Sequence, residues 1–398
     1  MADAPVEKQP RRARAWTWVA RVVRALPLLA AILALRFVPP LWSGWNARRW
    51  LDGDASLQLT LAEELLAFEK ADDAHRSTSP QPSRFAGEWA LVTHQMTALG
   101  LAQICLAHPD ERARLAPEVT RAAAKSFLPE MRSFGTRAWA GEDAMTSLGG
   151  PHGHAYLAYA ALALGMARLL DPDFPAALAK KHDALIAAYE RRLVVSPTGL
   201  IETYPGEAYP TDVAAVAAAI AVHGRATGAD HSRVLAHWKE QVFARQIDPK
   251  SGLVVQRMGA FDGKTHDAPR GSGTALAAYF AGFADRAVAA KLAEGLFRHE
   301  ATLGGFGAIL EYAEGHTGWG DVDSGPVLLG VSVSATGFAL APARALGYRD
   351  AFVRIFRTTE LFGAPVATEG RLRFLSGGPI GNALLLALLT SGPEVSPT

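Results

Sequence analysis

The chain has a single cysteine in 398 residues and almost no excess of charge of either sign. One cysteine, Cys105, excludes a disulfide framework and a thiolate-ligated metal site within the chain. A formal net charge of +1 gives no electrostatic footprint for nucleic acid, so no nucleic-acid partner is expected. Runs of β-branched residues are also scarce, whereas alanine is abundant within a hydrophobic content of 49%. This composition favours a helical protein over a sheet protein.

Three segments of the sequence repeat one plan at a constant distance. They begin at Gly199, Gly252 and Gly305, so each interval is 53 residues. Each segment has a glycine, a short apolar run, a long polar or aromatic loop, and then a helix made largely of alanine, glycine and serine. A period of this length is typical of stacked two-helix units.

Two kinds of helix are expected to alternate along the chain. Small-residue helices that are apolar on most faces are expected over residues 88–107, 153–170, 211–226, 272–283, 326–346 and 379–389. More polar, amphipathic helices are expected over residues 57–70, 112–131, 174–193, 231–245, 286–300 and 349–361. Alanine and glycine allow the close backbone approach that an inner ring requires, whereas outer helices need one wet face. The sequence therefore predicts an all-α fold, an (α/α)6 toroid, over residues 51–398.

Residues 1–50 form a separate basic and apolar appendage. An apolar run at residues 25–35 follows a cluster of arginines and is flanked by tryptophans. The run is shorter than the ~20 residues of a spanning helix, but it fits a signal anchor with interfacial tryptophans. Because the arginines precede the run, we expect the barrel on the extracytoplasmic (periplasmic) side. Because no convincing small-x-small cleavage site follows the run, we expect the membrane anchor to stay uncleaved. A helix lying on the membrane surface is the alternative.

A toroid also predicts where the functional site lies. Each inner helix begins after the long loop of its repeat, so the helix N-termini and their unpaired N–H groups point to one mouth of the barrel. The first candidates there are His152 and His154 in GGPHGHAYLAY. The helix dipole would keep His154 neutral, as a base or a group that orients a hydroxyl. The alternative is that His154 only forms a hydrogen bond with a carbonyl group of its own loop.

The second candidate segment is TGLIETYPGEAYPTD, residues 198–212. Glu202 follows an apolar run, so we expect it to have a raised pKa and to serve as a general acid. Asp212 stands where a helix cap belongs and is either the cap or a catalytic base. Tyr204 and Tyr209 are expected to form a wall of the same site.

The third candidate segment is WGDVDSGPVLLG, residues 319–330. Asp321 and Asp323 flank one valine directly before a Ser-Gly-Pro helix start, so one of them is expected to cap the helix and the other to point inward. We expect Asp323 or Ser324 to cap the following helix and Asp321 to face the site.

Met258 and Trp319 are predicted to line the cavity and contact the substrate. A metal site built from His152, His154 and the aspartates of the third segment would lack a recognised ligand spacing. Neither a metal nor a cofactor is therefore expected.

Three motifs follow one another in the chain: HGHAYLAY, GLIETYPGEAYPTD, and IDPKSGLVV with a small-residue helix after it. Over about residues 87–389, this order resembles that of the linalool dehydratase/isomerase-like family of (α/α)6 barrels. The resemblance implies an apolar funnel in which acid–base residues remove or migrate the hydroxyl group of an isoprenoid alcohol. It also implies that His154, at the family's helix-opening histidine, contacts that hydroxyl. This chain has Glu202 and Asp212 where the family has two active-site cysteines, so activity on linalool itself is not expected.

The favoured hypothesis is a cofactor-independent lyase or isomerase acting on an isoprenoid or lipid-like alcohol. Glu202 would be the acid, and Asp212 or His154 the base. One alternative is a glycan-processing enzyme, a hydrolase or epimerase, because such toroids often carry paired carboxylates beside aromatic residues. Another is a non-catalytic lipid-binding or scaffold toroid. The expected partners are a small apolar alcohol, the membrane and a second copy of the chain.

Overall fold

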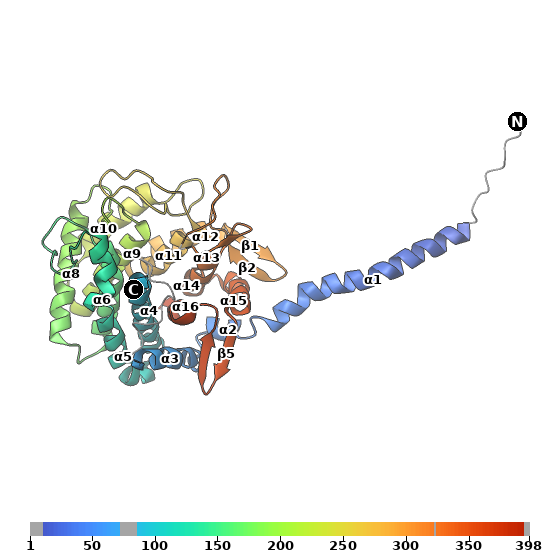
Figure 1. Ribbon diagram of the computed structural model, residues 1–398, viewed down its shortest axis with the longest axis horizontal. Helices are drawn as coiled ribbons and strands as arrows, with labels where there is room; N and C mark the ends of the chain where they lie inside the picture. Colours follow the sequence, from blue (N-terminus) through green and yellow to red (C-terminus); the bar gives the residue numbers. More distant parts are fainter. Residues whose placement is uncertain (1–10, 72–85, 322–323, 394–398) are drawn as a thin grey trace, which may run out of the picture.

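The structure is a computed structural model that describes residues 11–71, 86–321 and 324–393. Within these ranges the helices form two concentric rings, and the named strands pair into short antiparallel hairpins. Figure 1 shows helices α4 and α16 near the centre of the barrel and α3, α5 and α8 at its periphery. The prediction of an (α/α)6 toroid is confirmed.

The inner ring is built from small-residue helices. They are α4 (Ala86–Ala107), α7 (Ala158–Leu170), α9 (Pro210–Thr227), α11 (Gly271–Ala284), the short pair α13 (Val333–Phe338) and α14 (Leu340–Leu346), and α16 (Gly378–Thr390). Each packs on the next, and α16 returns to α4. A Cβ atom on Gly100 of α4 would lie 2.5 Å from the side chain of Leu386 and 3.0 Å from the nitrogen of Ala387. Glycine therefore allows the approach of α4 and α16 that closes the ring.

The outer helices each bury one face against the inner ring. They are α3 (Ala55–Lys70), α5 (Arg112–Lys125), α8 (Ala176–Val195), α10 (Ser232–Gln241), α12 (Arg286–Phe297) and α15 (Arg349–Gly363), accompanied by α2 (Ala47–Leu51) and α6 (Pro129–Ala138). Two of them begin at aspartate caps: Asp54 accepts a hydrogen bond from the backbone of α3, and Asp285 accepts two from that of α12. The polar helices were thus predicted close to their observed bounds.

The repeated glycines have one conformation in common. Gly199, Gly252 and Gly305 have φ values of +65°, +75° and +89°. This left-handed region favours glycine because it has no Cβ atom. At Gly252 a Cβ would also lie 3.1 Å from the Cα of Gly295 on α12. The 53-residue interval in the sequence therefore marks a structural repeat.

The third repeat departs from the expected helix over residues 326–346. Strands β3 (Val327–Leu328) and β4 (Val331–Ser332) form a hairpin there, and α13 begins only at Val333. Ser332 caps that helix by accepting a hydrogen bond from the nitrogen of Ala335. The prediction that Ser324 is the cap is wrong, because Gly325 and Gly330 have positive φ values and turn the chain before the helix. Asp323 lies outside the described residues.

Two further hairpins were not predicted. They are β1 (Glu300–Leu303) with β2 (Phe306–Ile309), and β5 (Pro365–Thr368) with β6 (Arg371–Phe374). Their two-residue turns are Gly304–Gly305 and Glu369–Gly370, and all four residues have positive φ. That backbone is the one that two-residue hairpin turns require.

Helix α1 (Arg11–Trp42) projects away from the barrel (Figure 1). Side chains in its middle, including Leu26, Leu29 and Ile32, are exposed. Among the described residues, the helix that is long and apolar enough to cross a membrane is residues 87–107 of α4, and most of it is buried in the ring. The membrane anchor at the N-terminus stays a prediction.

Candidate functional site

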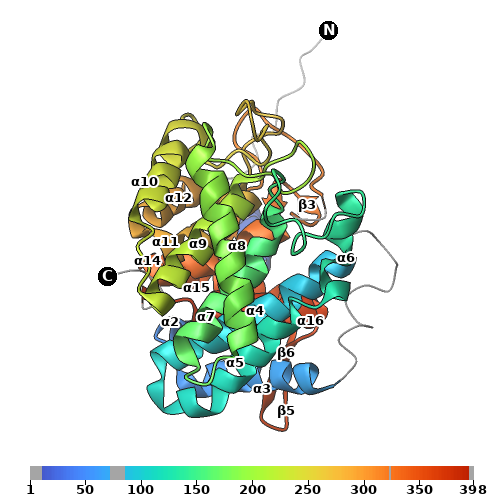
Figure 2. The same cartoon turned by 90° about the vertical axis from the view of Figure 1, so that its left-hand side faces the viewer.

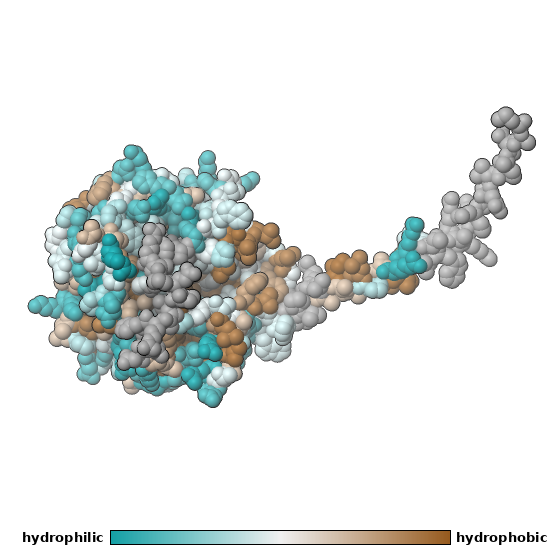
Figure 3. Space-filling view, in the orientation of Figure 1, coloured by the Kyte–Doolittle hydropathy of each residue, from teal (hydrophilic) through white to brown (hydrophobic). Residues whose placement is uncertain are grey.

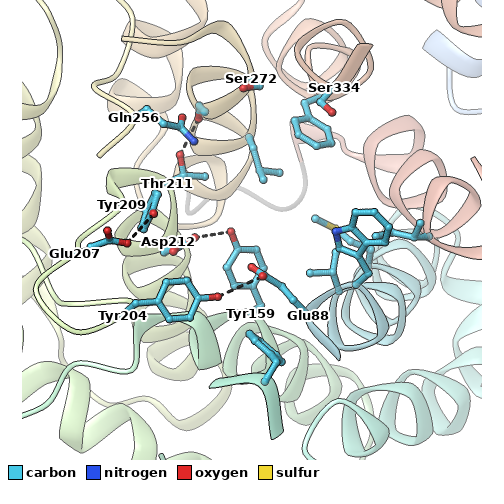
Figure 4. Close-up of a pocket in the computed structure, with 18 of the residues that line it drawn as sticks. Glu88, Tyr159, Tyr204, Glu207, Tyr209, Thr211, Asp212, Gln256, Ser272 and Ser334 are labelled. Carbon is cyan, nitrogen blue, oxygen red and sulfur yellow. Dashed lines mark hydrogen bonds between the residues drawn. The ribbon is translucent and has the colours of Figure 1, made fainter. Parts of the chain in front are cut away.

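A cavity of about 700 Å³ opens where the inner helices begin. Figure 2 shows long loops gathered at the upper end of the barrel, around β3, and Figure 4 shows the cavity itself. Its lining includes Glu88 from the first turn of α4, Asp212 from that of α9 and Ser272 from that of α11. The predicted convergence of helix N-termini on one mouth therefore holds in the structure.

Asp212 is a carboxyl group of this cavity that is held at both of its oxygens. Helix α9 begins at Pro210, so Asp212 lies inside the first turn, and its side chain is free of the capping role considered for it. The hydroxyl of Tyr159 donates to its Oδ1 at 2.7 Å, and that of Thr203 donates to its Oδ2 at 2.7 Å. Burial raises the pKa of Asp212, although both hydroxyl groups act to lower it. Burial of this kind favours the protonated form of a carboxyl group.

Two other carboxylates line the same cavity. Glu88 accepts a hydrogen bond from the hydroxyl of Tyr204 at 3.3 Å. Glu207 accepts from the hydroxyl of Tyr209 at 3.1 Å and forms an ion pair with Arg257 at 2.6 Å. In Figure 4, Tyr159 points toward Asp212 and Tyr204 points toward Glu88. The cavity thus combines an ion-paired carboxylate, Glu207, with two carboxyl groups, Asp212 and Glu88, that accept hydrogen bonds from hydroxyl groups.

Aromatic rings form much of the wall. Trp89, Phe134 and Phe338 join Tyr204 and Tyr209 in lining the cavity. The ring of Tyr204 is edge-on to that of Tyr209, with centroids 6.5 Å apart. The predictions that these two tyrosines line the mouth agree with their observed positions. Flat aromatic faces of this kind pack against apolar ring faces, while their hydroxyl groups bind polar groups.

Glu202 does not reach this cavity. Its Oε1 accepts a hydrogen bond from the nitrogen of Gly206 at 2.8 Å, and its side chain is buried. It lines a second cavity of about 350 Å³ together with Arg191 and Phe261. The loop turns between Glu202 and Tyr204, so the two side chains line different cavities. The apolar run before Glu202 did not indicate which cavity its side chain would face.

His152 and His154 are held by a third residue that the sequence did not indicate. The carboxylate of Glu142 lies 2.8 Å from Nδ1 of His152 and 2.9 Å from Nε2 of His154. The ring of Trp139 packs against both imidazoles. Burial lowers the pKa of His154, and the hydrogen bond from His154 leads the interactions that lower the pKa of Glu142 to about 2. His152 and His154 therefore stabilise the conformation of their loop, and neither lines the larger cavity.

The remaining predicted residues also lie away from the cavity lining. Met258 is buried in a bridge to Ala208, and the side chain of Trp319 is 91% exposed. Asp321 forms an ion pair with Arg270 and exchanges hydrogen bonds with Ser324. These contacts hold the loop before the β3–β4 hairpin.

Glu88 and Glu311 are also among the acidic residues that the sequence reasoning missed. Glu88 stands in the first turn of an otherwise apolar helix, and that contrast is a signal in AGEWALVTH. Glu311 is fully buried, and its Oε1 accepts a hydrogen bond from the hydroxyl of Ser272 at 2.6 Å. Burial raises the pKa of Glu311. It supports the start of α11 from behind the cavity wall, and no spacing in the sequence points to it.

No protein-family model and no curated protein matches the chain. Among solved structures, the chain is similar to an inactive variant of an α-1,6-mannanase of Salegentibacter sp. HEL1_6 in complex with α-1,6-mannotetrose. The TM-score is 0.51 at 16% identity, over 86% of this chain and 98% of that one. It is also similar to an unsaturated glucuronyl hydrolase specific for heparin, with a TM-score of 0.53 at 13% identity, over 86% of this chain and 96% of that one. At these identities the likeness shows the fold.

These findings overturn the expected lyase or isomerase of isoprenoid alcohols. The similar structures are those of glycan-processing enzymes. The residues assigned to the earlier reaction are also dispersed, since Glu202 and His154 lie outside the lining of the cavity that contains Asp212. The expectation of an apolar alcohol as substrate depended on that reaction. The resemblance to the linalool dehydratase/isomerase-like family stays a prediction.

Proposed function

We propose that the protein is a glycan-processing enzyme, a glycoside hydrolase, whose site is the cavity at the inner-helix N-termini. The observation that carries this proposal is the carboxyl group of Asp212, which faces the cavity between two hydroxyl donors and has a raised pKa. Glycoside hydrolysis needs one such protonated carboxyl group and a second, ionised one nearby. The fold shared with a mannanase and a glucuronyl hydrolase supports the same assignment.

In this proposal Asp212 is the general acid. Its proton goes to the glycosidic oxygen as the bond from that oxygen to the anomeric carbon breaks. A water molecule supplies the new oxygen on the anomeric carbon, and Glu88 takes the proton from that water. The hydroxyl of Tyr159 fixes the orientation of the acid through its 2.7 Å hydrogen bond.

The cavity walls suit a sugar. The rings of Trp89, Tyr204 and Tyr209 offer flat faces for the apolar side of a pyranose, and Gln256 and Thr211 offer polar groups for its hydroxyls. The volume of about 700 Å³ lies in the usual range for a cleft that encloses a small ligand. We infer that the site accepts the end, or a short internal stretch, of an oligosaccharide.

We also propose that α1 anchors the enzyme to a membrane, with the barrel on the extracytoplasmic side. The exposed apolar side chains of Leu26, Leu29 and Ile32 support this. Arg21 and Arg24 stand on the N-terminal side of that apolar stretch, as expected of a segment whose N-terminus stays in the cytoplasm.

The test compares three variants of the full chain on α-1,6-linked manno-oligosaccharides and unsaturated glucuronyl disaccharides. Asp212→Asn is expected to lower kcat by about 10²- to 10⁴-fold because the amide has no proton to give. Glu88→Gln is expected to lower it similarly. Glu202→Gln is the matched control, since Glu202 is a buried glutamate outside this cavity, and its activity should stay within about twofold. Equal activity of Asp212→Asn and the wild type would refute the assignment.

A further inference from the structure

A cluster of histidines lies at the other end of the barrel from the cavity. His182 and Asp183 stand near the start of α8, and His223 stands near the end of α9. His223 follows Asp212 by 11 residues on the same helix, which is about 16 Å along the helix axis. The cluster is therefore separate from the proposed catalytic site.

His182 is fully buried, and neither of its ring nitrogens has a hydrogen-bond partner among the described residues. Its ring is edge-on to that of His223, with centroids 5.1 Å apart. A buried imidazole with two unsatisfied nitrogens is costly, since buried polar groups are normally paired. Both its N–H group and its other ring nitrogen, whose lone pair can bind a metal, therefore lack a partner among the described residues.

The neighbouring contacts also lack one hydrogen. A chain of contacts runs from Glu190 to His231 at 2.8 Å, from His231 to His223 at 2.9 Å, and from His223 to Asp183 at 3.0 Å. Each contact needs one hydrogen between two acceptors. Two neutral imidazoles supply only one N–H each, and ionised carboxylates supply none. One of the three gaps must therefore hold an extra proton or a cation.

The cluster of Glu142, His152 and His154 makes a useful comparison. One carboxylate accepts from two imidazoles there, so two N–H groups serve two contacts. Those two contacts are complete with both rings neutral, although Nδ1 of His154 is buried without a hydrogen-bond partner among the described residues. The shortage of one hydrogen therefore distinguishes the contacts of the cluster on α8 and α9.

We propose that His182, Asp183 and His223 bind one divalent transition-metal ion, such as Zn²⁺, which holds outer helix α8 against inner helix α9. One ligand atom from each residue lies within 4.8 Å of the others. A tetrahedral zinc site places its ligand atoms about 3.4 Å apart, so binding requires the three ligand atoms to move closer together. Two histidines and one carboxylate form a ligand set that suits this ion, with the fourth position left for water.

The surrounding groups fit this assignment. With a metal on Nε2 of His223, its Nδ1–H donates to His231, and Nδ1–H of His231 donates to Glu190, so each hydrogen-bond contact has its proton. Hydrogen-bond partners of this kind fix the orientation of a metal-bound imidazole. Asp183 is exposed, which gives the ion a route from solvent. Arg168, which forms an ion pair with Asp183, is the competing cation.

The experiment titrates the metal-stripped full chain with Co²⁺, whose visible absorption reports tetrahedral coordination, and then displaces it with Zn²⁺. We expect about one ion per chain for the wild type and a rise in Tm when Zn²⁺ is added. Binding should weaken at least about 100-fold in His223→Gln. It should weaken about tenfold in His231→Gln, which removes only the hydrogen-bond partner of His223. His152→Gln, from the complete cluster, should bind as the wild type does.

His182 is buried, so its replacement can disturb folding. Asp183→Asn provides a second variant at an exposed position, and it should weaken Co²⁺ binding at least about tenfold without loss of the fold. Wild-type affinity in both Asp183→Asn and His223→Gln would overturn the proposal. So would the absence of stoichiometric binding to the wild type, in which case the contact chain holds an extra proton instead.

Discussion

Asp212 has few degrees of freedom because two hydroxyl groups determine where its carboxyl group points. Both donors come from outside its own helix: Tyr159 lies on α7, and Thr203 lies in the loop before α9. Burial raises the pKa of the carboxyl group, and each hydroxyl bond offsets part of that rise. The proton affinity of the proposed acid is therefore adjustable by single substitutions beside it.

Thr203→Val tests this directly. Removing a donor that favours the ionised form raises the pKa of Asp212 further, so the acid keeps its proton to a higher pH. The alkaline limb of the kcat profile is expected to move upward by up to about one pH unit. Thr211→Val is the control, because its hydroxyl lines the same cavity but donates to the carbonyl of Gly273. A downward movement of the limb in Thr203→Val would contradict the role of Asp212 as acid.

The positions of single residues were predictable where a helix start fixed them. Asp212 and Tyr209 stand at the first turn of α9, and the sequence located that turn within a residue or two. Glu202 and His154 lie in loops, where the side on which a residue faces depends on hydrogen bonds to distant segments. For His154 that partner is Glu142, whose carboxylate lies 2.9 Å from its Nε2. No periodicity in the sequence reports such a partner.

At the scale of elements, the two kinds of helix were predictable because burial selects composition directly. Inner helices such as α9 are almost wholly buried and alanine-rich, whereas outer helices such as α5 keep a polar face. The hairpins were missed because their strands are only two to four residues long. Their turn glycines, Gly305 and Gly370, were nonetheless present as a signal.

Gly252→Ala tests the structural meaning of the repeat. The substitution places a Cβ in the left-handed region and 3.1 Å from the Cα of Gly295, so the loop or α12 must move. We expect a loss of about 3 kcal/mol in the free energy of unfolding, measured by denaturant titration. Gly228→Ala is the control, since Gly228 has a φ of +78° with nothing within 4 Å of its added Cβ. Its expected loss is about 1 kcal/mol. Equal losses would contradict the close approach at Gly252.

At the scale of the whole molecule, the two ends of the barrel carry different groups of residues. One end gathers the helix N-termini and the cavity, and the other contains the histidine cluster. Figure 3 shows apolar residues along α1, which stands clear of the barrel. Three predictions concern the surroundings of the chain: the membrane anchor, the extracytoplasmic side for the barrel, and association with a second copy. Neither the sequence pattern nor the fold determines these surroundings.

The anchor is tested with the double variant Leu29→Asp and Ile32→Asp in the full chain. Each aspartate in a hydrocarbon environment costs about 3 kcal/mol, so association with vesicles of phosphatidylcholine and phosphatidylglycerol should fall at least about tenfold. Leu303→Asp is the control, because that exposed leucine lies on the β1–β2 hairpin of the barrel. Unchanged flotation of the double variant with vesicles would rule out α1 as the anchor.

The most direct test of the central claim is to incubate the wild-type chain with a panel of oligosaccharides in water enriched in ¹⁸O and to analyse the products by mass spectrometry. Hydrolysis at the cavity of Asp212 predicts shortened saccharides that carry one ¹⁸O at the newly formed end, and their loss in Asp212→Asn. Products without ¹⁸O, or no cleavage of any oligosaccharide in the panel, would contradict the assignment of a glycoside hydrolase.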